Sequence, residues 1–160
     1  MDQWQWPVAD GTRSLSVVGG QTQDSLAHLQ RGSGPAVDLP GYDGQRLQLL
    51  VPDAAFSFGL YDPECGYKVD FTWLGERGRW DARYCHLSTY ATLMVGQTGT
   101  AQGPHVHLAL WLNGERVWPE EQLEFRALME SQLKPVFSQQ STQLALIGVG
   151  IIFGLLLLRR

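Results

Sequence analysis

Three of the four histidines in this 160-residue chain lie in two short segments. Histidine binds metals and transfers protons near neutral pH. His86 stands in one segment, and His105 and His107 stand two residues apart in the other, directly after Gly103-Pro104. Because residues i and i+2 of a strand point to the same face, His105 and His107 can face one cleft. The pair suits a zinc site in which one imidazole binds the metal and its neighbour transfers protons.

A bare His-x-His pair is also compatible with ordinary surface or core histidines on a hairpin, so the neighbouring residues decide between the two interpretations. A catalytic zinc needs about three protein ligands and an open position for water, so a carboxylate and a further donor must come from elsewhere in the chain. The cysteines offer no such donor set, because no Cys-x-x-Cys spacing is present.

The residues around the histidines resemble the motifs of one enzyme family. Gly103-Pro104-His105-Val106-His107 resembles the G-P-H-L-H signature of the lysostaphin-type zinc endopeptidases, which cut peptidoglycan peptides. Tyr84-Cys85-His86-Leu87-Ser88 resembles the Y-A-H-L-S segment of that family, and Ala36-Val37-Asp38-Leu39-Pro40 resembles the G-V-D-I-x segment that carries its carboxylate ligand. Five shorter segments also resemble family motifs: Trp6-Pro7-Val8, Asp43-Gly44-Gln45, Val95 to Gly99, Asn113-Gly114 and Val117-Trp118-Pro119. With them, the resemblance extends over roughly residues 4–125.

The resemblance implies a role for each of these residues. Asp38 and His107 would bind Zn²⁺, and His86 and His105 would flank the water that attacks the substrate, one of them taking its proton. The reaction implied is hydrolysis of a peptide bond in cell-wall peptide.

One ligand position departs from the family pattern. The family has a second zinc-binding histidine four residues before the aspartate, and Gly34 stands at that position here. His28 lies ten residues before Asp38 in the polar stretch Gln21–Gly34, which we expect to be a loop. We hypothesise that this loop folds back and makes His28 the missing metal ligand; the alternative is an ordinary exposed histidine.

Short apolar runs broken by Gly, Pro and Asp predict a mainly β fold, an antiparallel sheet in a metallopeptidase-like domain over residues 1–118. Asn113-Gly114 between two apolar runs predicts a tight hairpin. The predicted strands are Leu47–Val51, Ala54–Leu60, Tyr67–Leu74, Trp80–Leu87, Thr92–Val95 and Val106–Leu112.

A short amphipathic helix over residues 119–134 is expected to follow the sheet. Pro119 suits its first turn and Phe125 lies on its apolar face, so it would pack on the β domain or form a stalk. Cys65 and Cys85 could form a disulfide in an oxidising compartment or stay as two free thiols.

The chain ends in an apolar run, residues 144–158, after a polar linker at 135–143. This run approaches the ~20 apolar residues that a membrane-spanning helix needs, so we expect a single-pass C-terminal transmembrane anchor, with a buried core helix as the alternative. Gly150 and Gly154 are spaced for close helix approach, which would allow a homodimer. Topology stays open, because the absence of an N-terminal signal peptide favours a cytosolic domain whereas Arg159-Arg160 favours a cytosolic C-terminus.

The net charge of −4, from 12 basic and 16 acidic residues, argues against nucleic acid as a partner. The expected partners are peptidoglycan peptide and a lipid membrane. The leading function is a membrane-anchored zinc endopeptidase of peptidoglycan, and lack of a secretion signal suggests the virion membrane of a bacteriophage. A catalytically degenerate module with a structural or peptidoglycan-binding role is the alternative from a different functional class.

Overall fold

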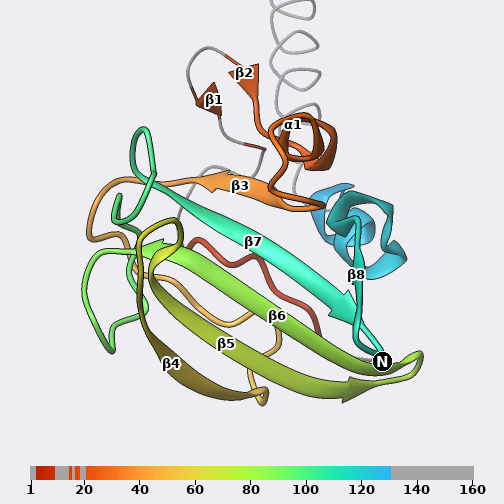
Figure 1. Ribbon diagram of the computed structural model, residues 1–160. Coiled ribbons are helices and arrows are strands. Elements are labelled where there is room, and N and C mark those ends of the chain that lie inside the picture. The colour runs from red at the N-terminus through yellow and green to blue at the C-terminus, as the bar shows by residue number, and fades with distance from the viewer. Residues whose placement is uncertain (1–2, 10–14, 16, 19–20, 131–160) are drawn as a thin grey trace, which may run out of the picture. The chain divides into compact units, whose positions relative to one another are not determined.

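An antiparallel sheet of six strands forms the centre of the fold, in the order β3-β7-β6-β5-β4 with β8 paired to β7 (Figure 1). Its strands are β3 (Val37–Pro40), β4 (Ala55–Asp62), β5 (Gly66–Gly75), β6 (Gly78–Leu87), β7 (His105–Leu112) and β8 (Glu115–Val117). Two short strands, β1 (Val17–Val18) and β2 (Gln21–Thr22), pair separately. The expected mainly β, antiparallel fold is thus confirmed.

This computed structural model describes residues 3–9, 15, 17–18 and 21–130. Residues Met1–Met129 form one compact unit. The expected linker at 135–143 and apolar anchor at 144–158 lie outside the described residues. Within the described ranges, no helix is long and apolar enough to cross a membrane.

One face of the sheet is buried under the N-terminal segment and residues 46–51 (Figure 1). The predicted strands Leu47–Val51 and Thr92–Val95 are wrong. Leu47 and Val95 form isolated β-bridges and no continuous ladder. Leu47, Leu49 and Leu50 are all buried, so this apolar run covers the sheet instead of extending it. The core-facing sheet residues alternate along the strands and include Val69, Phe71, Trp73, Trp80, Ala82, Tyr84, Val106, Leu108 and Leu110.

The hairpin between β7 and β8 turns at Asn113 and Gly114, as predicted. Their φ angles of 53° and 85° are both positive, which is the requirement of the tight turn that matches strand twist. This turn brings β8 back along β7 and places Arg116 opposite Trp111.

The expected loop over Gln21–Gly34 is wrong, because a helix, α1 (Ser25–Gln30), forms inside it. Asp24 caps the helix by accepting a hydrogen bond from the Ala27 amide at 2.9 Å. The helix buries polar Ser25 and His28 but leaves Leu26 52% and Leu29 47% exposed. Its apolar side chains therefore face solvent, and the usual apolar stripe of a packed helix gives no signal.

The chain after the sheet begins with a 3₁₀ turn, η1 (Pro119–Glu121), and continues as a helix from residue 123 to the last described residue, 130. The turn and the helix are separated at Gln122, so the expected single helix from 119 is two pieces. Phe125 is fully buried and stacks on Trp6 with ring centroids 6.1 Å apart. This part of the chain therefore packs on the β domain.

Cys65 and Cys85 form a disulfide with their Cα atoms 4.9 Å apart, which resolves the open question of their pairing. Cys65 lies in the turn between β4 and β5, and Cys85 lies on β6 next to His86. The bond therefore ties the β4–β5 turn to the strand that carries one of the predicted site histidines.

Candidate metal centre

Pairing of β3 with β7 brings Asp38 and His107 together. The two residues are direct cross-strand partners, so their side chains lie on the same face of the sheet, opposite to the core. The Asp38 Oδ1 to His107 Nδ1 distance is 3.0 Å, and Asp38 is 3% exposed. A carboxylate and an imidazole nitrogen are thus fixed side by side by the sheet register.

Helix α1 adds His28 to this pair from outside the sheet. The His28 Nε2 atom lies 3.0 Å from Asp38 Oδ1. The Asp38 amide donates a hydrogen bond to the Gln23 carbonyl at 3.0 Å, which ties the segment before α1 to β3. Ser25 Oγ donates to a Glu120 carboxylate oxygen at 2.6 Å, so the start of the helix is also held by η1. Ligand atoms of His28, Asp38 and His107 all lie within 4.8 Å of one another.

The donor set suits a cation. His28 Nδ1 lies 2.7 Å from the Asp24 carbonyl, which can only accept, so Nδ1 carries the proton and donates. In neutral His28 the Nε2 atom then presents a lone pair to the Asp38 carboxylate. Two electron-rich atoms at 3.0 Å need a proton or a metal ion between them. Ligands 2.0–2.2 Å from a tetrahedral zinc are about 3.3 Å apart, close to the 3.0 Å from Asp38 Oδ1 to His28 Nε2 and to His107 Nδ1.

Electrostatics keeps this ligand group ready for a metal. Burial raises the pKa of Asp38, but its contacts with His107 and His28 outweigh burial and hold the pKa below its ordinary value of 3.8. Burial also lowers the pKa of His107 below 6.5. Near neutral pH the carboxylate is ionised and His107 is neutral, which are the protonation states that bind metal.

His105 and His86 lie beside the ligand group with one ring nitrogen each in use. His105 Nδ1 donates to the Gly103 carbonyl at 2.8 Å, and its Nε2 lies 3.6 Å from Asp38 Oδ1. His86 Nδ1 donates to the Thr98 carbonyl at 2.7 Å. The two rings are 4.8 Å apart between centroids, and the Nε2 atom of each is left as a proton acceptor.

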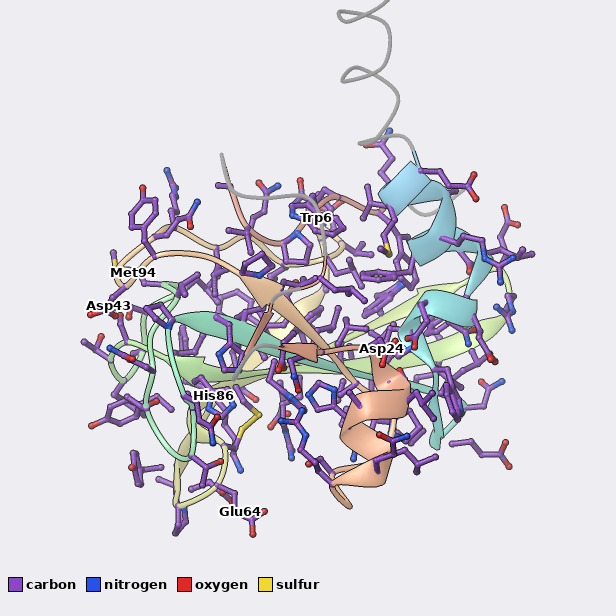
Figure 2. All side chains as sticks on the ribbon, turned by 90° about the horizontal axis from the view of Figure 1, so that it is seen from above. Trp6, Asp24, Asp43, Glu64, His86 and Met94 are labelled. Carbon is purple, nitrogen blue, oxygen red and sulfur yellow. A yellow bond between two sulfur atoms is a disulfide. The ribbon has the colours of Figure 1, made fainter. Side chains whose placement is uncertain are left out.

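A bulge at the end of β6 places the His86 side chain. The β5–β6 ladder shifts register between Tyr67 and Val69, and His86 has a φ of 64°. The extra residue on β6 breaks the alternation of the strand, and Cys85, His86 and Leu87 are consecutively buried. Figure 2 shows His86 beside the Cys65–Cys85 disulfide.

Burial, followed by the charge that His105 can carry, lowers the pKa of His86 from 6.5 to about 4. His86 is therefore neutral over the whole physiological pH range. Its Nε2 lone pair stays available, and no second proton competes for it.

The five predicted site residues, His28, Asp38, His86, His105 and His107, all line one cleft, with a volume of about 660 Å³. The structure does bring them together, although they come from α1, β3, the end of β6 and β7. The same cleft is lined by Arg31, Arg83, Trp111 and Arg116, which sequence reasoning did not select. A second groove of about 560 Å³ on the outer face of the sheet shares Arg83 and Trp111 with it.

The sequence analysis also missed the two backbone carbonyls that orient site histidines, Asp24 O at His28 and Thr98 O at His86. Every residue has a carbonyl group, so residue type does not identify such an acceptor. The signal for Asp24 was its suitability as a helix cap before Ser25. Gly34, the departure from the family pattern, does not contribute to the ligand group. A ring nitrogen of His28 lies within 4.8 Å of the ligand atoms of Asp38 and His107.

No protein-family model matches this chain. No curated protein sequence matches it either. Among solved structures, it is similar to a crystal structure of a protein provisionally named peptidase M23 from Pseudomonas aeruginosa, with 24% sequence identity and a TM-score of 0.49. The similarity covers 80% of this chain and 52% of that one, so this chain spans about half the length of the other protein.

Proposed function

We propose that this protein is a zinc-dependent endopeptidase of the lysostaphin type that hydrolyses peptide bonds in peptidoglycan. The observation that carries the proposal is the convergence of His28, Asp38 and His107 on one point. His105 and His86 stand beside that point, and each holds its ring in place through a hydrogen bond from Nδ1 to a backbone carbonyl. The motif resemblance of the two histidine segments supports the same conclusion and supplies the substrate class.

In this proposal His28 Nε2, the Asp38 carboxylate and His107 Nδ1 hold the zinc. Zinc at this position supplies a Lewis acid, which polarises the scissile carbonyl and makes water more acidic. His105 Nε2, 3.6 Å from Asp38 Oδ1, takes the proton of the attacking water and returns it to the leaving amine. His86, fixed by Thr98, stays neutral, and its Nε2 is the second acceptor beside the metal, where it accepts a hydrogen bond from the attacking water.

The zinc requirement is tested with the purified chain by measuring metal content and cleavage of purified cell walls. We expect about one equivalent of zinc and cleavage that a chelator abolishes. Asp38→Asn should lose both the metal and activity. His105→Gln should keep the metal and lose activity, whereas Arg79→Gln, remote from the ligands, should change neither.

A zinc content below about a tenth of an equivalent, together with intact walls, would overturn the proposal. The chain would then fit the alternative of a degenerate module. Zinc at full occupancy with intact walls and cleavage of another peptide would retain the hydrolase and reject the peptidoglycan substrate.

His28→Ala tests the ligand supplied by α1. We expect the zinc dissociation constant to rise at least about 100-fold, because only two protein ligands remain. Competition with a fluorescent zinc chelator measures it. Leu29→Ala is the matched control, since Leu29 lies on the same helix and is 47% exposed. Equal affinities of both variants would show that His28 is not a ligand.

We further propose that residues 144–158 attach this domain to a lipid membrane, so that it acts on wall peptide close to the bilayer. The Cys65–Cys85 disulfide supports a location on the oxidising side of a membrane. Attachment to a virion membrane stays a prediction from the sequence, and fractionation of membrane-containing virions would check it.

A further inference from the structure

Two arginines flank Trp111 in the lining of the cleft. Trp111 is on β7, Arg83 is on the neighbouring strand β6, and Arg116 is on β8 along the other edge of β7. The guanidinium carbon of Arg83 is 5.9 Å and that of Arg116 is 5.4 Å from the centroid of the indole ring. Both distances are within the range of attractive cation–π contacts, so Trp111 holds the two side chains in place.

The two arginines differ in how their charge is balanced. Arg83 donates to both oxygens of Asp70, at 2.6 and 3.3 Å. Arg116 donates its Nε–H to the Pro35 carbonyl at 2.9 Å, and no carboxylate of a described residue lies within 4.0 Å of it. Partial burial and the nearby charge of Arg83 lower the pKa of Arg116, so an anion beside it would be favourable.

Gly34 creates the space in which the Arg116 guanidinium lies. A Cβ atom at position 34 would stand 2.9 Å from Arg116 Nη1 and 3.1 Å from Cζ. Gly34 also has a φ of +75°, which disfavours other residues. The residue that departs from the family pattern therefore lets Arg116 lie against the backbone next to β3.

Arg116 and the metal ligands share one cleft. Arg116, Trp111, His107 and Asp38 all line it. One substrate molecule in this cleft could therefore place an amide bond at the metal and an anionic group at Arg116. Guanidinium groups bind carboxylates through two parallel hydrogen bonds, and the Nη atoms of Arg116 are not used by the Pro35 contact.

We propose that Arg116, held by Trp111 and accommodated by Gly34, forms a carboxylate subsite, and that the substrate is a peptide with a free carboxylate beside the scissile amide. This inference rests on the proposed peptidase function for its choice of a peptide ligand. Arg116 is a specificity residue here and takes no part in proton transfer.

Binding to the zinc-free chain tests the subsite without any need for catalysis. The full-length protein is kept in solution with a nonionic detergent, stripped of metal and freed of chelator. Two probes are titrated at low salt, N-acetyl-triglycine with a free carboxylate and the same peptide with a C-terminal amide. Shifts of the Trp111 indole N–H and the Arg116 Nε–H signals in ¹⁵N spectra give both dissociation constants.

We expect the acid to bind about tenfold more tightly than the amide, because one charge-assisted contact is lost in the amide. Arg116→Gln should remove this difference. Arg79→Gln also deletes one positive charge, but Arg79 is paired with Asp81 at 2.9 Å, so the difference should persist. Equal binding of acid and amide to the wild-type chain, or an equal effect of the two variants, would overturn the subsite. Inorganic phosphate binding more tightly than the acid would overturn the carboxylate assignment.

Hydrolysis gives a second readout. Arg116→Gln should lower kcat/KM on wall peptides about tenfold through KM, and should have little effect once the carboxylates of those peptides have been converted to amides. An equal loss on both substrates would indicate a structural role and contradict the inference. If the wild-type chain cleaves neither substrate, the proposed function fails while the binding result still decides on the subsite.

Discussion

At the scale of single residues, His86 combines a backbone conformation that costs stability with a buried ring that makes stability fall in acid. Its φ of 64° lies in the left-handed region, where a non-glycine residue costs about 1–2 kcal/mol. Its buried ring has a pKa of about 4 instead of 6.5. Both features are explained by one requirement, that the imidazole points into the cleft next to His105 while the Thr98 carbonyl accepts a hydrogen bond from its Nδ1–H.

The backbone cost predicts an unusual order of stabilities at position 86. Both His86→Gly and His86→Ala lose the ring and its hydrogen bond, but only glycine adopts positive φ freely. We expect the glycine variant to be about 1 kcal/mol more stable than the alanine variant, the reverse of the usual order in a strand. Urea unfolding of the zinc-free Met1–Gln140 fragment measures this. An alanine variant that is equally or more stable would show that the backbone at 86 is not strained.

The lowered pKa of His86 predicts how stability depends on pH. Between pH 6.5 and 4 the unfolded chain binds a proton at this histidine and the folded chain does not, so the free energy of unfolding falls as pH falls. The full contribution is present above pH 6.5. The loss at pH 5 is about 2 kcal/mol, and the lowered pKa of His107 acts in the same direction.

The test compares urea unfolding of the zinc-free fragment at pH 7 and pH 5. His86→Gln should lose less stability between the two pH values than the wild type, because its side chain does not titrate. If both proteins lose the same amount, the pH dependence arises elsewhere. The lowered pKa of Asp38 does not disturb this window, since it affects stability only below its ordinary value of 3.8.

At the scale of elements, the site depends on segments that are fastened together rather than on one strand. Thr98 and Gly99 lie against the β4–β5 turn, where a Cβ atom at Gly99 would stand 2.4 Å from the Glu64 carbonyl oxygen. The Thr98 hydroxyl accepts a hydrogen bond from the Tyr67 amide and donates one to the Leu87 carbonyl. The Thr98 carbonyl accepts the hydrogen bond from His86 Nδ1. The disulfide joins the same β4–β5 turn to β6. The end of β6 is thus restrained from two sides.

Removing the disulfide should weaken both the fold and the site. Cys65 and Cys85 are separated by 20 positions, and opening a loop of that size costs about 3 kcal/mol in the chain-entropy account. The Cys65→Ser/Cys85→Ser double variant should unfold at lower urea concentration by that free energy and should show slower wall-peptide cleavage. Unchanged stability in the double variant, or in the reduced wild type, would show that the bond adds nothing to the fold.

At the scale of the whole molecule, the sequence divides into a described domain and a C-terminal part of a different character. Residues Met1–Met129 form one compact unit with its own core. Residues 144–158 are all apolar or glycine. The overall charge of −4 does not describe the cleft, whose lining contains three arginines, Arg31, Arg83 and Arg116, and three carboxylates, Asp38, Asp62 and Glu64. Substrate attraction therefore depends on where these opposite charges lie in the cleft and not on the net charge of the chain.

The apolar C-terminal run predicts that the full chain partitions with lipid. We expect it to sediment with vesicles and to resist alkaline carbonate extraction, because about 15 apolar residues are transferred from water into hydrocarbon. The Met1–Gln140 fragment is the control and should stay in the supernatant. Recovery of the full chain in the supernatant would contradict the anchor.

The sequence by itself determined the antiparallel β class, the Asn113-Gly114 hairpin and four of the six sheet strands, because alternating apolar residues and turn residues act over short distances. The His-x-His spacing placed His105 and His107 on one strand face, and the resemblance of the motifs to one enzyme family selected Asp38 and His86. These are local properties, and residue types and their spacing carry them directly.

Only the tertiary structure decided the place of His28, of Arg116 and of the disulfide. Helix α1 buries its polar side and exposes two leucines, so hydrophobic patterning could not detect it or bring His28 to Asp38. Arg116 meets Gly34 across 82 positions of sequence, and Cys65 meets Cys85 through the sheet register. Each depends on contacts between segments distant in the chain, and the physical reason is that such contacts are chosen by the packing of the whole domain rather than by local residue preference.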